Sequence, residues 1–169
     1  MDKRWAFIII ILFIGLGSMV LIVSNSDTVG SAIVTFSKTT ITLPHGYSVD
    51  EADGYSVSLY KKDGAEKITI EDEGKKDTSK ESLMNLSDEI LGLEGNNTTT
   101  NITKNKINNV SVYQTEITYE NGTVYLSSLY YQKHTYIIIM EKFKNKDDVD
   151  KEIKFILNTM HPDYKQSQD

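Results

Sequence analysis

The sequence predicts an α+β domain in which an antiparallel sheet of about six to eight strands packs with two helices, preceded by one transmembrane helix. Three observations lead to this prediction. Many segments alternate apolar and polar residues with period 2, two segments repeat apolar residues at spacings of three and four, and the N-terminus is a long uncharged apolar run. The alternating and helical segments follow the order β-β-β-β-α-β-β-β-β-α.

The N-terminal run, residues 5–23, contains no charged side chain. As a helix it would be about 28 Å long, close to the hydrocarbon thickness of a bilayer. Lys3 and Arg4 precede it, and basic residues stay preferentially on the cytoplasmic side. We therefore expect a single-pass cell-membrane protein divided into a cytoplasmic tail (1–4), an anchor (5–23), a tether (24–32), an extracytoplasmic domain (33–162) and a flexible tail (163–169).

Two other interpretations of this run stay open. The segment Ser24-Asn25-Ser26 offers small residues at which a signal peptide could be cleaved. The apolar run is, however, longer than the roughly 7–15 residues usual in signal peptides. The run could also be a buried helix of a soluble protein, which we favour least.

The first half of the domain reads as strands separated by turns. A break at Pro44-His45-Gly46 ends the second strand, and Asp63-Gly64 lies between two alternating runs as in a β-hairpin. The four strands expected here are 33–36, 40–43, 55–61 and 67–71.

A helix is expected after residue 78, because Thr78-Ser79-Lys80-Glu81 has the form of a capping box. One apolar stripe follows at helical spacing, formed by Leu83, Leu86, Ile90 and Leu93. Residues 94–104 have no periodicity and predict a surface loop.

The second half predicts a meander that ends in a helix. Its strands are expected at 102–107, 110–119, 123–133 and 135–143, with turns at Asn108-Asn109 and Asn121-Gly122. Residues 137–140 are apolar on both faces, which is typical of a strand in the centre of a sheet. The final helix begins at the acids of 147–150 and ends before Pro162, with Val149, Ile153, Ile156 and Met160 as its apolar stripe.

The segment Ile41-Thr42-Leu43-Pro44-His45-Gly46-Tyr47, a strand ending in Leu-Pro-x-Gly-aromatic, resembles the opening of PsbP-like domains. Those domains continue with a hairpin, a helix, an antiparallel meander and a C-terminal helix, which is the order predicted here for residues 33–160. The resemblance implies an adaptor or binding role rather than a reaction, and it implies no catalytic residues.

Composition excludes several classes of function. The net charge is −6, whereas nucleic-acid binding needs a concentrated positive face, so we expect no nucleic-acid partner. The chain has no cysteine, which excludes disulfides, a thiolate nucleophile and a thiolate metal site.

The sequence contains no recognisable catalytic or metal-binding motif. The three histidines, His45, His134 and His161, lack a second histidine at helical spacing, and we expect them to be exposed or capping residues. The acidic runs 71–73 and 147–150 lack the spacing of a calcium loop, although weak calcium binding is an alternative. We therefore expect no enzyme activity, no cofactor and no metal.

Two groups of residues are candidates for surface functions. The tyrosines Tyr130, Tyr131 and Tyr136 are candidates for a partner-binding face, with packing in the sheet as the alternative. Asn-x-Ser/Thr sequons are concentrated in the loop, where Asn96, Asn97 and Asn101 are candidate N-glycosylation sites.

The sequence thus favours a membrane-anchored extracytoplasmic domain without enzymatic activity that acts through contacts with a protein or an envelope component. A surface sensor or ligand-binding module is the first alternative. An envelope-acting hydrolase, with carboxylates brought together by folding, is the second.

Overall fold

The structure is a computed structural model that describes residues 32–61, 64, 66–93, 101–119 and 122–162. The predicted cytoplasmic tail, membrane anchor and C-terminal tail, and all of the tether before residue 32, lie outside the described residues. Among the helices that are described, none is long and apolar enough to span a membrane.

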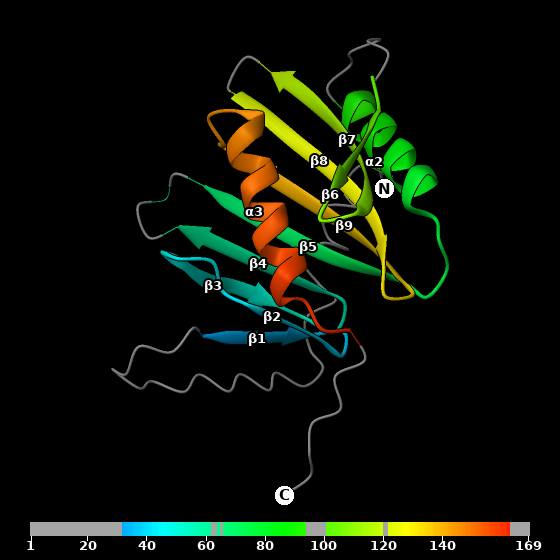
Figure 1. Cartoon of the computed structure of the whole chain (residues 1–169). Coiled ribbons are helices and arrows are strands. Elements are labelled where there is room, and N and C mark those ends of the chain that lie inside the picture. Colours follow the sequence, from blue (N-terminus) through cyan, green and yellow to red (C-terminus); the bar gives the residue numbers. More distant parts are fainter. Residues whose placement is uncertain (1–31, 62–63, 65, 94–100, 120–121, 163–169) are drawn as a thin grey trace, which may run out of the picture.

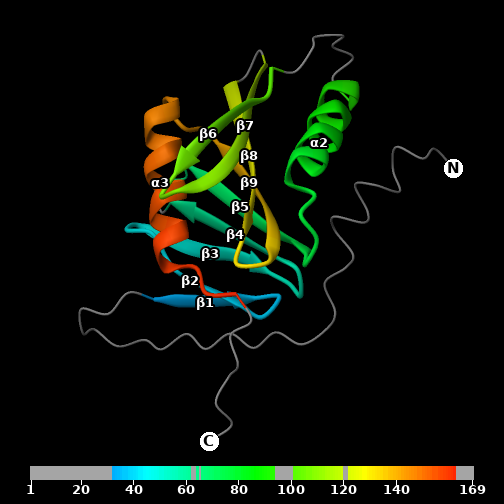
Figure 2. The same ribbon diagram turned by 45° about the vertical axis from the view of Figure 1, so that its right-hand side comes forward.

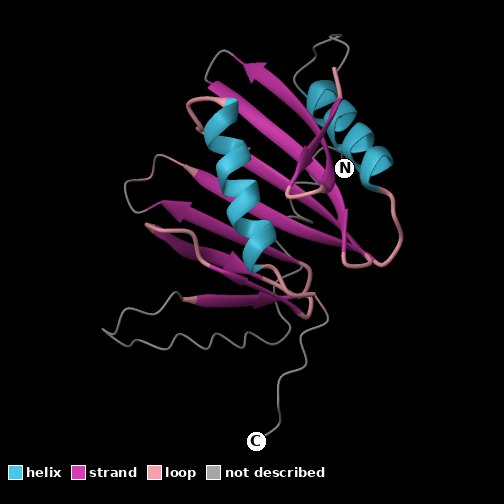
Figure 3. Ribbon diagram, in the orientation of Figure 1, coloured by secondary structure: helices cyan, strands magenta, loops and turns pink. Residues whose placement is uncertain are grey.

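The described part of the chain forms an α+β fold, as predicted (Figure 3). Two helices and two antiparallel sheets make up this fold. The elements are β1 (Ile33–Phe36), β2 (Thr39–Thr42), β3 (Tyr47–Ala52), β4 (Ser56–Lys61), β5 (Lys67–Gly74), α2 (Ser79–Leu93), β6 (Thr103–Ile107), β7 (Val110–Tyr119), β8 (Gly122–Tyr131), β9 (His134–Glu141) and α3 (Lys146–Thr159).

The main sheet has seven strands in the order β3-β4-β5-β9-β8-β7-β6, and β1 and β2 form a separate hairpin (Figure 1). The pairing of β5 with β9 joins the two halves of the chain in the middle of the sheet. The two helices lie on opposite faces of the sheet, so the molecule has three layers (Figure 2). The apolar run 137–140 lies in β9, in the centre of the sheet, as predicted.

The larger core lies between α3 and the sheet and also includes the β1-β2 hairpin. The predicted stripe of α3 forms its helical side, because Val149, Ile153, Ile156 and Met160 are all buried. The helix begins where the Asn145 side chain accepts a hydrogen bond from the Asp148 amide (3.0 Å). This N-cap is stabilising because it pairs an amide that the helix itself leaves unpaired.

A smaller core lies under α2 on the other face, where the helix packs on β7, β8 and β9. Leu83 and Leu91 are its buried helical residues, and Ile117 and Leu126 face them from the sheet. The same face of β3, β4 and β5 is not covered by a described helix.

Three features of the secondary structure differ from the sequence prediction. The strand β3 was not expected, because its apolar alternation is limited to Tyr47 and Val49 and is broken at Glu51. It is an edge strand, and its register shifts between Val49 and Glu51. Gly122 pairs with Tyr119, so it belongs to β8 and not to the centre of the turn. The capping box is also replaced by a tertiary contact, since the Thr78 amide donates to the Thr135 hydroxyl (3.1 Å).

Candidate functional site

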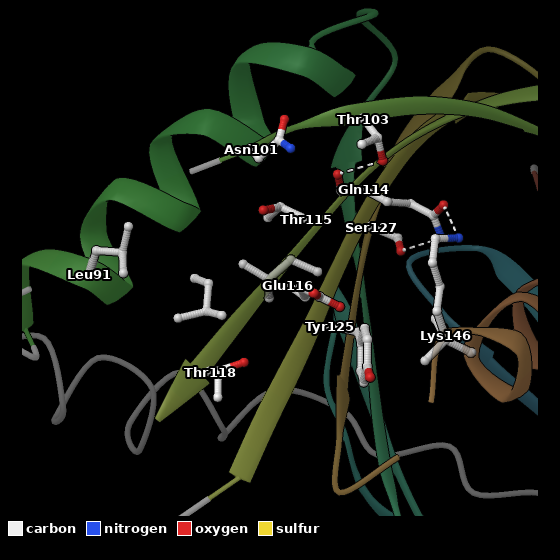
Figure 4. Close-up of a pocket in the computed structure, with 13 residues that line it drawn as sticks. Leu91, Asn101, Thr103, Gln114, Thr115, Glu116, Thr118, Tyr125, Ser127 and Lys146 are labelled. Atoms are coloured by element: carbon white, nitrogen blue, oxygen red, sulfur yellow. Dashed lines mark hydrogen bonds between the residues drawn. The ribbon is translucent and has the colours of Figure 1, made fainter. Parts of the chain in front are cut away.

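A cleft of about 500 Å³ opens along the edge of the main sheet next to the second half of β7. Leu91 near the end of α2 and Lys146 at the start of α3 lie on opposite sides of it (Figure 4). The start of β6, the segment 114–118 of β7 and the segment 125–127 of β8 complete its lining.

The cleft exists because β6 is shorter than β7. The register pairs Thr103, the first residue of β6, with Gln114, but β7 continues to Tyr119. Beyond Gln114, the edge of β7 therefore has no strand of the described residues beside it. A sheet edge of this kind presents backbone amide and carbonyl groups at the surface.

The two walls of the cleft differ in chemistry. On the side of α2 its lining is mainly apolar and includes Leu91, Ile117 and Leu126, all buried, together with the buried Thr115. On the side of α3 the cross-strand neighbours Glu116 and Tyr125 line it, and Glu116 is exposed. Burial raises the pKa of the Tyr125 hydroxyl, and the Glu116 carboxylate raises it further, so the phenol stays neutral.

A network of hydrogen bonds forms the inner end of the cleft around the buried amide of Gln114. Its amide nitrogen donates to Asp150 (2.8 Å), and its amide oxygen accepts from Lys146 (2.9 Å) and Asn105 (2.7 Å). The Lys146 ammonium also pairs with the Asp150 carboxylate at 2.6 Å. These groups satisfy one another and fix the start of α3 against β6 and β7.

The structure separates the three candidate tyrosines. Tyr130 is exposed, whereas Tyr131 is half-buried against the larger core, on the opposite face of β8, and its hydroxyl accepts from Gln132 (2.8 Å). Tyr136 is fully buried, and its hydroxyl bonds to Thr39 (2.8 Å). The expectation that Tyr136 lies on an accessible face is therefore wrong, since β9 is central and this side chain is buried in the larger core against the β1-β2 hairpin. The three tyrosines do not form one surface. Partner binding by Tyr130 and Tyr131 stays a prediction.

Of the candidate glycosylation sites, Asn96 and Asn97 lie outside the described residues. Asn101 is exposed just before β6 and borders the cleft. Glycosylation of these residues stays a prediction.

His134 is a buried residue, and the expectation of an exposed or capping histidine is wrong here. Its Nδ1–H donates to both oxygens of Asp72 (3.1 and 3.0 Å), and its ring stacks on Tyr136. The Gly74 amide also donates to Asp72 (2.8 Å). The pairing of β5 with β9 creates this contact, and no local sequence signal could have indicated it.

The acidic run 71–73 is split between the two faces of β5. The Asp72 side chain is buried on the face of β5 that carries the larger core. The side chains of Glu71 and Glu73 lie on the other face. Burial raises the pKa of Glu71, with further increases from Glu73 and Asp53. Within the described ranges, no group of three or more histidine, aspartate or glutamate side chains could bind a metal ion.

No protein-family model matches the chain, and no curated protein matches its sequence. The fold is similar to a crystal structure from Bacteroides thetaiotaomicron, with a TM-score of 0.53 and 13% identity over 83% of this chain and 50% of that chain. This chain thus spans half the length of that protein, and the similarity shows the fold alone.

A second similar structure is the solution structure of a cyanobacterial PsbP from Synechocystis. Its TM-score is 0.47, and its identity is 9% over 75% of this chain and 87% of that chain. A PsbP structure is therefore among the solved structures that this chain resembles.

Proposed function

We propose that the chain is a single-pass membrane protein whose extracytoplasmic PsbP-like domain acts without catalysis, by contact with another protein or an envelope component. The cleft beside β7 is the observation that carries this proposal. It combines an open sheet edge, an apolar wall and an exposed carboxylate, Glu116, which are features of a surface that binds a chain.

The polar groups at the inner end of the cleft support binding over catalysis. Lys146 and Asp150 are engaged with each other and with Gln114, an arrangement that stabilises the start of α3. The tether adds to the proposal, because confinement near a membrane raises the effective concentration toward membrane partners.

The membrane part of the proposal rests on the apolar run 5–23 and on Lys3 and Arg4 before it. Its topology can be tested with single-cysteine variants, since the chain contains no cysteine. In intact cells, a membrane-impermeant maleimide should label Glu89→Cys, an exposed position on α2, and should label Asp2→Cys only after lysis. Labelling of both only after lysis would contradict the orientation.

Partner contact can be tested with a photo-crosslinking residue in the full-length protein in its membrane. A residue placed at Thr118, on the cleft, should give crosslinked species that are missing when it is placed at Glu51, on the opposite edge strand. Equal crosslinking at both positions, or none at either, would refute a partner site at the cleft.

The volume of the cleft favours one alternative, a ligand-binding module. About 500 Å³ is within the usual range for small-molecule pockets. The cleft is, however, open along the sheet edge, whereas such pockets usually enclose most of the ligand. A small molecule that abolished the Thr118 crosslinks would support this alternative.

A further inference from the structure

We propose that β7 binds an extended peptide of the partner as an additional strand, and that this peptide alternates basic and apolar side chains. The inference rests on the proposed function and names the chemistry of its partner. Three features of the cleft support it: the direction of the backbone groups, the charge on one wall and the apolar surface of the other.

The hairpin formed by β6 and β7 determines where the backbone groups of β7 point. A two-residue turn, Asn108–Asn109, joins Ile107 to Val110, which are therefore a hydrogen-bonded pair. Every second residue after Val110 directs its amide and carbonyl to the same side, away from β8. The Thr103 hydroxyl confirms this direction, because it donates to the carbonyl of Gln114 (3.3 Å).

The same alternation directs the amides and carbonyls of Glu116 and Thr118 toward the cleft. In the register of β6 and β7, the position opposite Glu116 belongs to Asn101, which lies outside the strand. No described strand therefore pairs with these two residues. Two consecutive hydrogen-bonding positions of this kind are what a bound peptide uses when it extends a sheet.

The α3 side of the cleft favours a basic side chain. Glu116 is exposed and lies in register with the ring of Tyr125, so a lysine or arginine beside them would meet a carboxylate and an aromatic face (Figure 4). The only described cation in the lining is Lys146, and its charge is paired with Asp150 at 2.6 Å. The net charge of −6 also favours a basic partner.

The α2 side favours an apolar side chain. A strand directs successive side chains to opposite faces, so the neighbours of the basic residue would point toward Leu91, Ile117 and Leu126. These three residues belong to the smaller core, and an apolar peptide residue would extend that core.

A second copy of this chain fits the site less well. Pairing β7 with β7 around a two-fold axis would bring the Glu116 carboxylates of the two copies to the same edge. Like charges on neighbouring strands are destabilising, and each copy also carries a net charge of −6.

Amide hydrogen exchange, measured by NMR on the full chain in detergent micelles, tests the proposal and contains its own control. In the free protein the amides of Thr115 and Ile117, which point to β8, should exchange slowly, and those of Glu116 and Thr118 quickly. The probes are two eight-residue peptides, one alternating valine and lysine and the other alternating valine and glutamate. The lysine peptide should slow exchange at Glu116 and Thr118 by at least about tenfold, and the glutamate peptide should not.

A matched pair of variants tests the role of charge. Glu116→Lys should weaken binding of the lysine peptide by about fivefold or more. Glu51→Lys, an exposed carboxylate on the opposite edge strand, should leave it unchanged. The protection of Thr115 and Ile117 shows in each case that the sheet is folded.

Four results would overturn the proposal. Slow exchange at Glu116 and Thr118 in the free chain would mean that another part of this chain occupies the edge, and protection that rises with protein concentration would mean that a second copy does. Equal protection by both peptides would refute the charge preference. No protection by either, with site-specific crosslinking at Thr118 retained, would refute strand addition and leave the proposed function intact.

Discussion

Two buried polar residues, Gln114 and His134, show how the fold places side chains that a sequence pattern assigns to the surface or leaves unassigned. Each lies in a strand and finds its partner on a distant element, Asp150 for Gln114 and Asp72 for His134. Buried polar groups must be paired, because an unpaired one keeps the full cost of losing water. The identity of the partner depends on strand order, so local sequence could not predict either contact.

The pair of His134 and Asp72 predicts a large effect on stability. His134→Phe keeps a ring in the core but removes a hydrogen bond from a buried carboxylate, so we expect the free energy of unfolding to fall by about 3 kcal/mol. Urea unfolding followed by circular dichroism measures this change.

The exposed His45 is the matched control, and His45→Ala should change stability by less than about 0.5 kcal/mol. The double variant Asp72→Leu with His134→Phe should regain part of the loss, because it removes the uncompensated charge. A loss of equal size for the two single histidine variants would show that the buried pair is not the cause.

The raised pKa of Glu71 predicts that replacing this residue stabilises the folded state, in contrast to the replacement of His134, and that the gain depends on pH. Folding raises the pKa of this carboxyl, mainly through burial, so its ionised form destabilises the folded state. This loss of stability is absent when the pH is below 4.5, the ordinary pKa of a glutamate. It develops as the pH rises from there through the folded-state pKa, and it is complete above that pKa. Glu71→Gln should therefore be more stable than the parent at pH 7, by about 0.5 kcal/mol after allowance for partial exposure.

Unfolding curves for Glu71→Gln and the parent at pH 7 and at pH 3.5 check this prediction. The free energies of unfolding must be measured with an uncertainty of about 0.2 kcal/mol. The advantage should vanish at the lower pH. Glu89→Gln, an exposed carboxyl on α2, should show no such dependence. An advantage for Glu71→Gln that persists in acid would exclude ionisation as its origin.

At the scale of the element, helices were easier to predict than the ends of strands. Most of the apolar stripe of α3 was predicted, because Val149, Ile153 and Ile156 recur at helical spacing, but the buried Leu157 was not part of the prediction. Its N-cap, Asn145, was not, because Lys146 separates it from the acids that marked the helix start. The strand β3 was missed because it is polar at an edge, where one side of the strand needs no apolar cover.

Asn145 predicts how much one cap contributes to α3. Asn145→Ala removes the acceptor for the Asp148 amide and should lower the stability by about 1 kcal/mol. Asn145→Ser keeps an acceptor at that position and should restore most of it. Thermal unfolding of the two variants measures the difference, and equal losses would show that the cap is not stabilising.

At the scale of the whole molecule, the sequence predicted the fold class and the order of most elements but not the arrangement of the strands. Turn residues such as Asn108 and Asn109 indicate that consecutive strands pair, and they do. No local signal indicates that β5 pairs with β9. The cleft could not be predicted for a related reason. It depends on β6 starting at Thr103 while β7 continues to Tyr119.

The central pairing of β5 with β9 also has a consequence for how the molecule is made. Both strands bury residues in the same core, yet the helix α2 and three further strands separate them along the chain. A ribosome must therefore finish β9 before β3, β4 and β5 gain their neighbour, and a folding chain must first close this long loop. High contact order of this kind slows folding, so a nascent chain that stops short of Glu141 exposes an incomplete sheet.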